Sequence, residues 1–187
     1  MCDGFDFGGW SLRAASVRGL THRYASQPRQ DAYALRYSAG RQRLVIAVCD
    51  GVGGAPESHR AAEITAGCLA DRFVDREDDD DDWTAAFTLA SDAVLSAAAE
   101  FERIERSVDA ARAVMATTAT LVVIDGVGAA GTWTVRAASV GDSAVWIADR
   151  PGPEAGFGRR SSADGLSTAM GPRPPRRRRC PCAMVRG

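Results

Sequence analysis

The pattern of apolar and polar positions predicts strands, then helices, then strands again. Leu44 to Val48 is an unbroken apolar run rich in β-branched residues, which is typical of a buried strand. Residues 32–37 alternate in character, and the short turn at 38–41 joins them to the apolar run, so a β-hairpin is expected. A looser alternation at 11–18 indicates a first strand.

Two helices are expected in the middle of the chain. Pro56 suits the first turn of a helix running to about Val74. Its expected inward face comprises Ala61, Ile64, Cys68 and Phe73. The acidic run at 75–82 cannot pack and predicts a solvated loop. The second helix spans Trp83 to Arg106, where apolar side chains recur at helical spacing. These are Phe87, Ala90, Val94, Ala97, Phe101 and Ile104.

After Met115 the pattern returns to that of strands. Residues 117–124, 132–138 and 144–148 each favour a strand, and a glycine-rich turn at 125–131 separates the first two. Strands followed by helices and strands again predict the α+β class, with antiparallel sheets and the helices layered on one side.

Charge divides the chain into two parts. Residues 1–150 contain 15 Arg and 22 acidic residues, for a net charge of −7, whereas residues 151–187 contain 8 Arg and 2 acidic residues, for +6. The second part also holds most of the prolines and four consecutive arginines at 176–179. We therefore expect a folded domain over 1–150 and a disordered tail over 151–187. A shifted reading frame in the second part is the alternative.

Other features bear on compartment and partners. The five cysteines follow no disulfide pattern, and Cys180-Pro-Cys182 lacks partner ligands for a metal, so we expect reduced thiols in a cytoplasmic protein. No apolar run approaches the roughly 18 residues of a membrane span, and no secretory leader is evident. We expect a monomer that does not bind a membrane. We also expect no binding of nucleic acid, because the folded part is acidic and the tail lacks interleaved aromatic residues.

The strongest chemical signal is Asp50, which follows the buried strand directly and precedes Gly51, Gly53 and Gly54. In an antiparallel hairpin the start of one strand lies beside the end of the other, so Asp31 should neighbour Asp50. Adjacent carboxylates repel each other unless a cation holds them. Their oxygen atoms suit Mg²⁺ or Mn²⁺. The alternative is that one aspartate caps a turn while the other is solvated.

Four short motifs in order resemble those of metal-dependent serine/threonine protein phosphatases of type 2C. The motifs are Gln30-Asp31-Ala32, Ala47-Val-Cys-Asp50-Gly51-Val-Gly53-Gly54, Ala116-Thr-Thr-Ala-Thr120 and Val140-Gly141-Asp142-Ser143. The lead-in segments 19–22 and 28–31 look like a bacterial branch of that family, and the resemblance covers about residues 12–150. It implies a four-layer α-β-β-α sandwich of antiparallel sheets, incomplete here at the C-terminal end.

The resemblance also implies a two-metal centre that hydrolyses phosphorylated Ser/Thr proteins with Mn²⁺ or Mg²⁺. By position, Asp31 would bind one metal ion and Asp50 would bridge both, while Gly51 would offer its carbonyl. Asp142 matches a position that helps to bind a third ion. Arg23 and Arg29 are both candidates for binding the substrate phosphate.

The departures from the family pattern point to a truncated domain. The two later acidic motifs that complete the metal centre have no counterpart, since Asp164-Gly165-Leu166 lacks a buried strand before it. Whether the truncated chain is active stays open. Val52 stands where some relatives have a histidine, and His59 is expected on a helix surface.

Rival functions remain at this point. The principal alternative is a non-catalytic binding or regulatory domain on the phosphatase fold. A dinucleotide-binding module is disfavoured, because Pro56 occupies the third glycine position and Asp50 would face the pyrophosphate.

Overall fold

The computed structural model describes residues 1–7, 10–76, 82–126, 133–146, 168–170 and 183–184. In chain order its elements are β1 (Cys2–Phe7), β2 (Trp10–Ala15), α1 (Leu20–Tyr24), β3 (Ala32–Ser38), β4 (Arg43–Cys49), α2 (Ser58–Val74), α3 (Trp83–Glu102), α4 (Val108–Val114), β5 (Ala119–Asp125), β6 (Trp133–Val140), β7 (Thr168–Met170) and β8 (Ala183–Met184). No helix among them has both the length and the apolar character needed to cross a bilayer.

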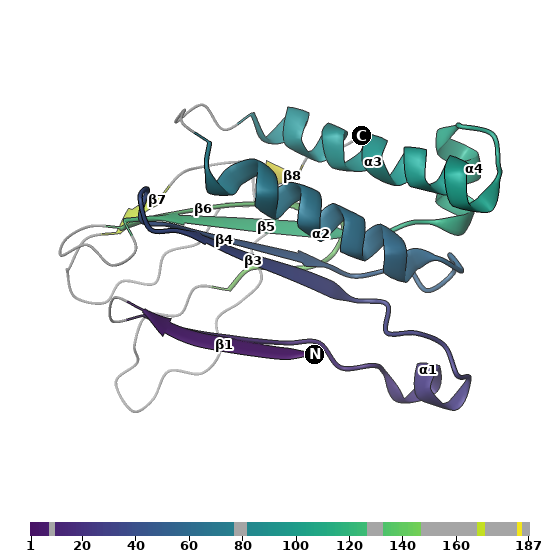
Figure 1. Ribbon diagram of the computed structural model, residues 1–187, viewed down its shortest axis with the longest axis horizontal. Coiled ribbons are helices and arrows are strands. Elements are labelled where there is room, and N and C mark those ends of the chain that lie inside the picture. Colours follow the sequence, from purple (N-terminus) through teal and green to yellow (C-terminus); the bar gives the residue numbers. More distant parts are fainter. Residues whose placement is uncertain (8–9, 77–81, 127–132, 147–167, 171–182, 185–187) are drawn as a thin grey trace.

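The strands form one large sheet and one small sheet (Figure 1). The large sheet has the order β3-β4-β5-β6-β7, in which every neighbouring pair is antiparallel, and β8 adds a short parallel pairing to β6. The small sheet is the antiparallel pair β1-β2. The α+β class is therefore confirmed.

Helices α2 and α3 cover one face of the large sheet (Figure 1). The buried face of α2 is rich in alanine, which lets its backbone approach β3 and β4 closely. Phe73 and Leu69 of α2 are fully buried against Val45 and Leu121 of the sheet. Phe73 also packs against Trp83 at the start of α3, with 4.8 Å between the ring centroids. This interface is the main core of the domain.

The small sheet packs on the opposite face of the large sheet. Trp10 of β2 contacts Trp133 of β6 edge to face, with ring centroids 5.0 Å apart. Leu12 joins them against Leu44 and Ile124. The helix layer, the large sheet and the small sheet supply three layers of the expected four-layer sandwich.

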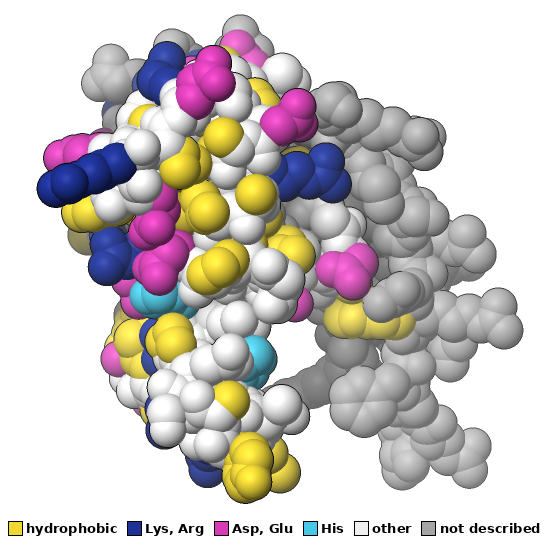
Figure 2. Space-filling view, turned by 90° about the vertical axis from the view of Figure 1, so that its right-hand side faces the viewer, with side chains coloured by type: hydrophobic (Ala, Val, Ile, Leu, Met, Phe, Trp, Pro, Cys, Tyr) yellow, Lys and Arg dark blue, Asp and Glu magenta, His cyan; other side chains and the backbone are white. Residues whose placement is uncertain are grey.

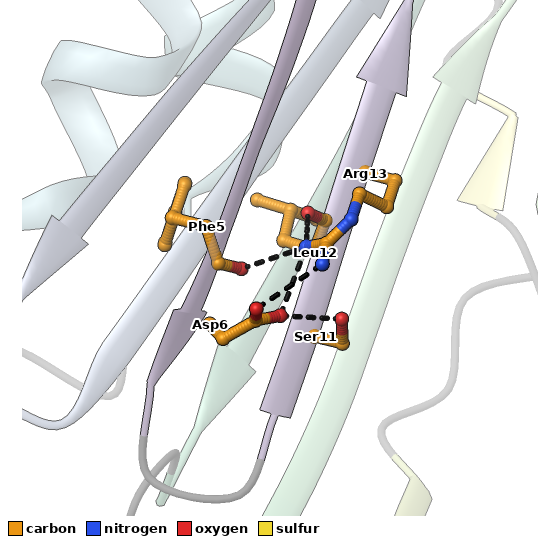
Figure 3. Close-up of polar contacts among 5 residues, drawn as sticks. All are labelled: Phe5, Asp6, Ser11, Leu12 and Arg13. Atoms are coloured by element: carbon orange, nitrogen blue, oxygen red, sulfur yellow. Dashed lines mark hydrogen bonds and ion pairs between the residues drawn. The ribbon is translucent and has the colours of Figure 1, made fainter.

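Polar contacts hold the β1-β2 hairpin near its turn (Figure 3). Arg13 donates to both carboxylate oxygens of Asp6, at 2.9 and 3.1 Å, and Ser11 donates to the same carboxylate. Hydrogen bonds from Arg13 and then Ser11 lower the pKa of Asp6. Strand β1 was missed in the sequence because its acidic residues hide the pattern, and these contacts explain how an acidic segment pairs as a strand.

Two helix boundaries and one predicted strand also differ from the prediction. Helix α2 begins at Ser58, because Pro56 lies in the turn before it, and Ile64 and Cys68 are only half-buried. Helix α3 ends at Glu102, since Arg103 adopts a left-handed conformation with φ of 53°. Residues 144–146, the described part of a predicted strand, are not in a strand.

Two short helices were also missed. Helix α4 begins at Val108 and is capped by Ser107, whose hydroxyl accepts a hydrogen bond from the Ala110 amide, and periodicity does not detect such a local cap. Helix α1 lies in the polar segment between β2 and β3 and buries none of its residues, so it leaves no apolar pattern. The predicted hairpin, in contrast, is confirmed as β3 and β4.

A cluster of charged side chains lies at the end of the large sheet where β4 begins and β5 ends. Arg43 of β4 is almost fully buried and donates to Asp125 of β5 at 2.5 Å. It also donates to the backbone oxygens of Phe73 and Arg76, which fixes the end of α2 against the sheet. Arg136 of β6 donates to the second oxygen of Asp125. The Asp125 carboxylate thus forms ion pairs with arginines from the two strands that flank β5.

We expect Asp125→Asn to destabilise the fold by about 3 kcal/mol, because it leaves the buried Arg43 guanidinium without its counter-charge. The matched control is Asp71→Asn, which breaks the exposed Arg36–Asp71 pair and should cost roughly 0–1 kcal/mol. Urea unfolding of both variants checks this. Equal losses in the two variants would contradict the role of the Arg43 cluster.

Candidate metal centre

The strand register places Asp31 beside Asp50. Ala32 of β3 pairs with Cys49 of β4, so the next residues outward, Asp31 and Asp50, leave the sheet side by side. The β3-β4 hairpin therefore places Asp31 and Asp50 next to each other, as the sequence predicts.

The two carboxyl groups influence each other. Asp50 is exposed at the surface, yet partial burial of its carboxyl raises its pKa, and hydrogen bonding and charge from Asp31 raise it further. The charge of Asp142 adds a smaller effect in the same direction. Burial and the charges of Asp31 and Asp142 therefore all disfavour the ionised form of Asp50, and no described cationic side chain forms an ion pair with it.

The two threonines just before β5 hold the backbone of Asp50 in place. Its carbonyl accepts hydrogen bonds from the Thr117 hydroxyl at 2.9 Å and from the Thr118 amide at 2.8 Å. Its amide donates to the Thr118 hydroxyl at 3.2 Å. The backbone that carries the Asp50 carboxylate is therefore held against the neighbouring strand through both of its polar groups.

Thr118 also connects Asp50 to the loop that carries Asp142. Its hydroxyl lies 3.2 Å from the hydroxyl of Ser143. Gly141 has a φ of +106°, and a Cβ atom at this position would lie 2.7 Å from the Thr118 side chain. Thr117 and Thr118 belong to the Ala116-Thr-Thr-Ala-Thr120 motif, but the sequence alone indicates no role for them, because their contacts exist only once β4 and β5 are paired.

Gly51 is buried where the chain leaves β4. Hydrogen bonds between Val52 and Ala116 and between Thr118 and Asp50 flank it, so its own amide and carbonyl face away from β5. Neither group takes part in a hydrogen bond among the described residues. A Cβ atom here would lie 2.7 Å from the Gln30 carbonyl oxygen, so only glycine fits.

These groups fit a hard divalent cation. Asp31 and Asp50 supply two adjacent carboxylates, and the carbonyl of Gly51 is not used by the fold. Over the described ranges, no three His, Cys, Asp or Glu side chains form a metal-binding group. Mg²⁺ is commonly bound through one or two carboxylates, with water and substrate phosphate as its other ligands.

Arg23 and Arg29, the candidate phosphate ligands, both line a hollow of about 480 Å³ next to Asp31. The Nε atom of Arg29 donates to the Asp31 carbonyl at 2.8 Å, as does the Ser16 hydroxyl at 3.2 Å. The structure therefore places Arg29 against the backbone of Asp31, and Arg23 lines the same hollow. Figure 2 faces this end of the molecule, where the lower lobe carries α1.

His59 is only partly at the surface. Its side chain is 23% exposed, its Nε2 lies 3.8 Å from a Glu57 carboxylate oxygen, and its Nδ1 is buried with no hydrogen-bond partner in the described part. Val52 is exposed. No contact joins either side chain to Asp31 or Asp50.

The sequence profile of the family described as Protein phosphatase 2C matches residues 18–155. The chain belongs to the protein phosphatase 2C family. A search of curated proteins and a search of solved structures each found no match. The matched segment contains β3, β4, β5 and β6 together with α2 and α3, so it covers four strands of the large sheet, the helix layer, and Asp31, Asp50 and Asp142.

In this member of the 2C phosphatase family, Asp31 and Asp50 differ from Asp125 at the other end of the sheet, which forms ion pairs with Arg43 and Arg136. No described cationic side chain forms an ion pair with Asp31 or Asp50, and carboxylate oxygens of this kind can serve as ligands for a hard divalent cation.

We expect Gly51→Ala to destabilise the protein by roughly 1–3 kcal/mol, because the new methyl group meets the Gln30 backbone and Ser58. Gly54→Ala is the matched control, since a Cβ atom there has no neighbour within 4 Å. Thermal denaturation of both variants is the measurement. A Gly51→Ala protein as stable as Gly54→Ala would show that the close packing around Gly51 is not required.

Proposed function

We propose that this protein is a phosphatase that hydrolyses phosphorylated serine or threonine in proteins with Mn²⁺ or Mg²⁺. The observation that carries the proposal is the pairing of Asp31 with Asp50 at the end of the β3-β4 hairpin, in a chain of the 2C phosphatase family. The raised pKa of Asp50 supports it, because a group strained by neighbouring negative charge gains most from a bound cation.

Each residue has a proposed role at this centre. Asp31 would hold one metal ion and Asp50 would hold two, with the carbonyl oxygen of Gly51 as a further ligand. Asp142 would help to hold a third ion. When bound, the ions supply an activated water molecule for in-line attack on phosphorus and offset the charge that develops on the phosphate.

The remaining residues orient the substrate and the ligands. Arg29 and Arg23 are the candidates for binding the phosphate oxygens, for which the guanidinium fork is well shaped. Thr117 and Thr118 hold the Asp50 backbone, so the bridging carboxylate needs little rearrangement when metal and substrate bind. Ser16 and Arg29 hold the backbone of Asp31 in the same way.

The test is hydrolysis of p-nitrophenyl phosphate and of a phosphothreonine peptide by the metal-free protein, before and after Mn²⁺ is added. We expect turnover that depends on Mn²⁺ and is removed by chelation. Asp50→Asn should lower kcat/KM by more than the roughly 10–100-fold that loss of an outer-shell partner costs. Asp92→Asn, on the exposed side of α3, should leave it unchanged.

The outcomes separate the proposal from its alternative. A wild-type protein that binds the phosphopeptide but does not hydrolyse it at any Mn²⁺ concentration would support the non-catalytic binding domain. Equal activity in Asp50→Asn and the wild type would contradict the assignment of the centre.

A further inference from the structure

The hollow beside Asp31 is more basic than a single phosphate group requires. It is lined by Met1, Ser16, Val17, Arg18, Arg23 and Arg29. Its volume of about 480 Å³ falls in the roughly 300–1,000 Å³ range of ligand pockets. We call this feature the arginine groove. A single phosphate contacted by one or two arginines would fill only part of it.

The three guanidinium groups have no counter-charge within the described part of the chain. Arg29 uses only Nε, for the Asp31 carbonyl, and Arg18 uses one Nη atom, for the Gln27 carbonyl at 3.2 Å. The Arg23 side chain forms no hydrogen bond or ion pair with the described residues. No described carboxylate forms an ion pair with any of the three. This contrasts with Arg43 and Arg136, which share Asp125.

The position of the groove links it to the metal centre. Two of its lining residues, Ser16 and Arg29, both donate to the carbonyl oxygen of Asp31. The Asp31 backbone is therefore the boundary between the carboxylate pair and the arginine groove. A substrate whose phosphate lies at the metal centre would place its neighbouring residues over Arg23 and Arg18.

Exposed apolar side chains occur in the same segment of the chain as the groove arginines. Val17 lines the groove and is 61% exposed, and Leu20 and Tyr24 are 81% and 94% exposed. A segment of this kind suits a polypeptide partner that carries both apolar and anionic side chains. A long nucleic acid is disfavoured, because residues 1–150 as a whole carry a net charge of −7, from 15 Arg and 22 acidic residues.

We propose that the arginine groove is a second anion subsite that selects phosphoproteins with an acidic or phosphorylated residue close to the phosphate being hydrolysed. Arg18, which lies furthest along the chain from Asp31, is the residue that recognises the second anion. This inference rests on the proposed phosphatase function, and it assigns that function a class of substrate.

The test compares three phosphothreonine peptides of one sequence, whose flanking positions carry alanine, aspartate or phosphoserine. We expect the wild type to prefer the aspartate peptide over the alanine peptide by roughly fivefold in kcat/KM, the size expected of partly exposed charge pairs. A larger preference for phosphoserine would identify phosphate as the better second anion. Added salt should reduce both preferences.

Substitution locates the effect. Arg18→Gln should bring the preference for the aspartate peptide close to one, whereas Arg18→Lys should keep part of it, because the charge remains without the planar fork. Arg112→Gln, on the exposed surface of α4, is the matched control and should keep the full preference. Melting temperatures of all variants show whether each one is folded. An unchanged preference in folded Arg18→Gln would overturn the inference.

A binding measurement without metal separates this inference from the proposed function. Fluorescence anisotropy of the labelled aspartate peptide in the presence of a chelator needs no turnover. If Arg18→Gln weakens binding of this peptide and the wild type hydrolyses nothing in Mn²⁺, the proposed phosphatase function is contradicted and the groove is still an anion-binding site. If the wild type hydrolyses all three peptides at equal rates, the phosphatase function stands and the anion-subsite inference is overturned. Tighter binding of a single-stranded oligonucleotide or of phosphatidylserine vesicles than of the aspartate peptide would also overturn it.

Discussion

The closeness of Asp31 and Asp50 is the constraint on which the rest of the centre depends. Their positions follow from the pairing of Ala32 with Cys49, so they cannot separate without breaking the β3-β4 hairpin. The neighbouring backbone is then fixed from several sides, by Thr117 and Thr118 at Asp50 and by Ser16 and Arg29 at Asp31. The fold holds two like charges together that would otherwise move apart.

The carboxylates at the two ends of the large sheet have opposite electrostatic surroundings. At one end, Asp125 is balanced by Arg43 and Arg136, and this cluster joins β4, β5, β6 and the end of α2. At the other end, Asp50 faces two more carboxylates, and the nearest arginines bind backbone oxygens or line the groove. The first end therefore holds a paired carboxylate, whereas the second end holds the carboxylates and arginines to which we assign the proposed cation and anion sites.

Much of this arrangement could be predicted from the sequence, for identifiable reasons. The apolar run before Asp50 and the short turn at 38–41 fix the hairpin, and the hairpin alone makes Asp31 and Asp50 neighbours. The roles of Thr118 and Gly141 could not be predicted, because they depend on contacts between segments more than 20 residues apart. Helices α1 and α4 are short and nearly devoid of buried residues, so no apolar period reveals them.

The most direct test of the central claim is the thermal stability of Asp50→Asn against the wild type, with and without Mn²⁺. The pKa of Asp50 is higher in the folded protein than in the unfolded chain. Between these two pKa values the folded protein binds more protons than the unfolded chain does. The contribution of Asp50 to the free energy of unfolding therefore falls as pH rises through that window. Without metal, Asp50→Asn should therefore melt at a higher temperature than the wild type at neutral pH, and the gain should vanish in acid. Mn²⁺ should raise the melting temperature of the wild type alone and reverse the order. A variant that melts below the wild type at neutral pH without metal, or that gains as much from Mn²⁺ as the wild type does, would contradict the account.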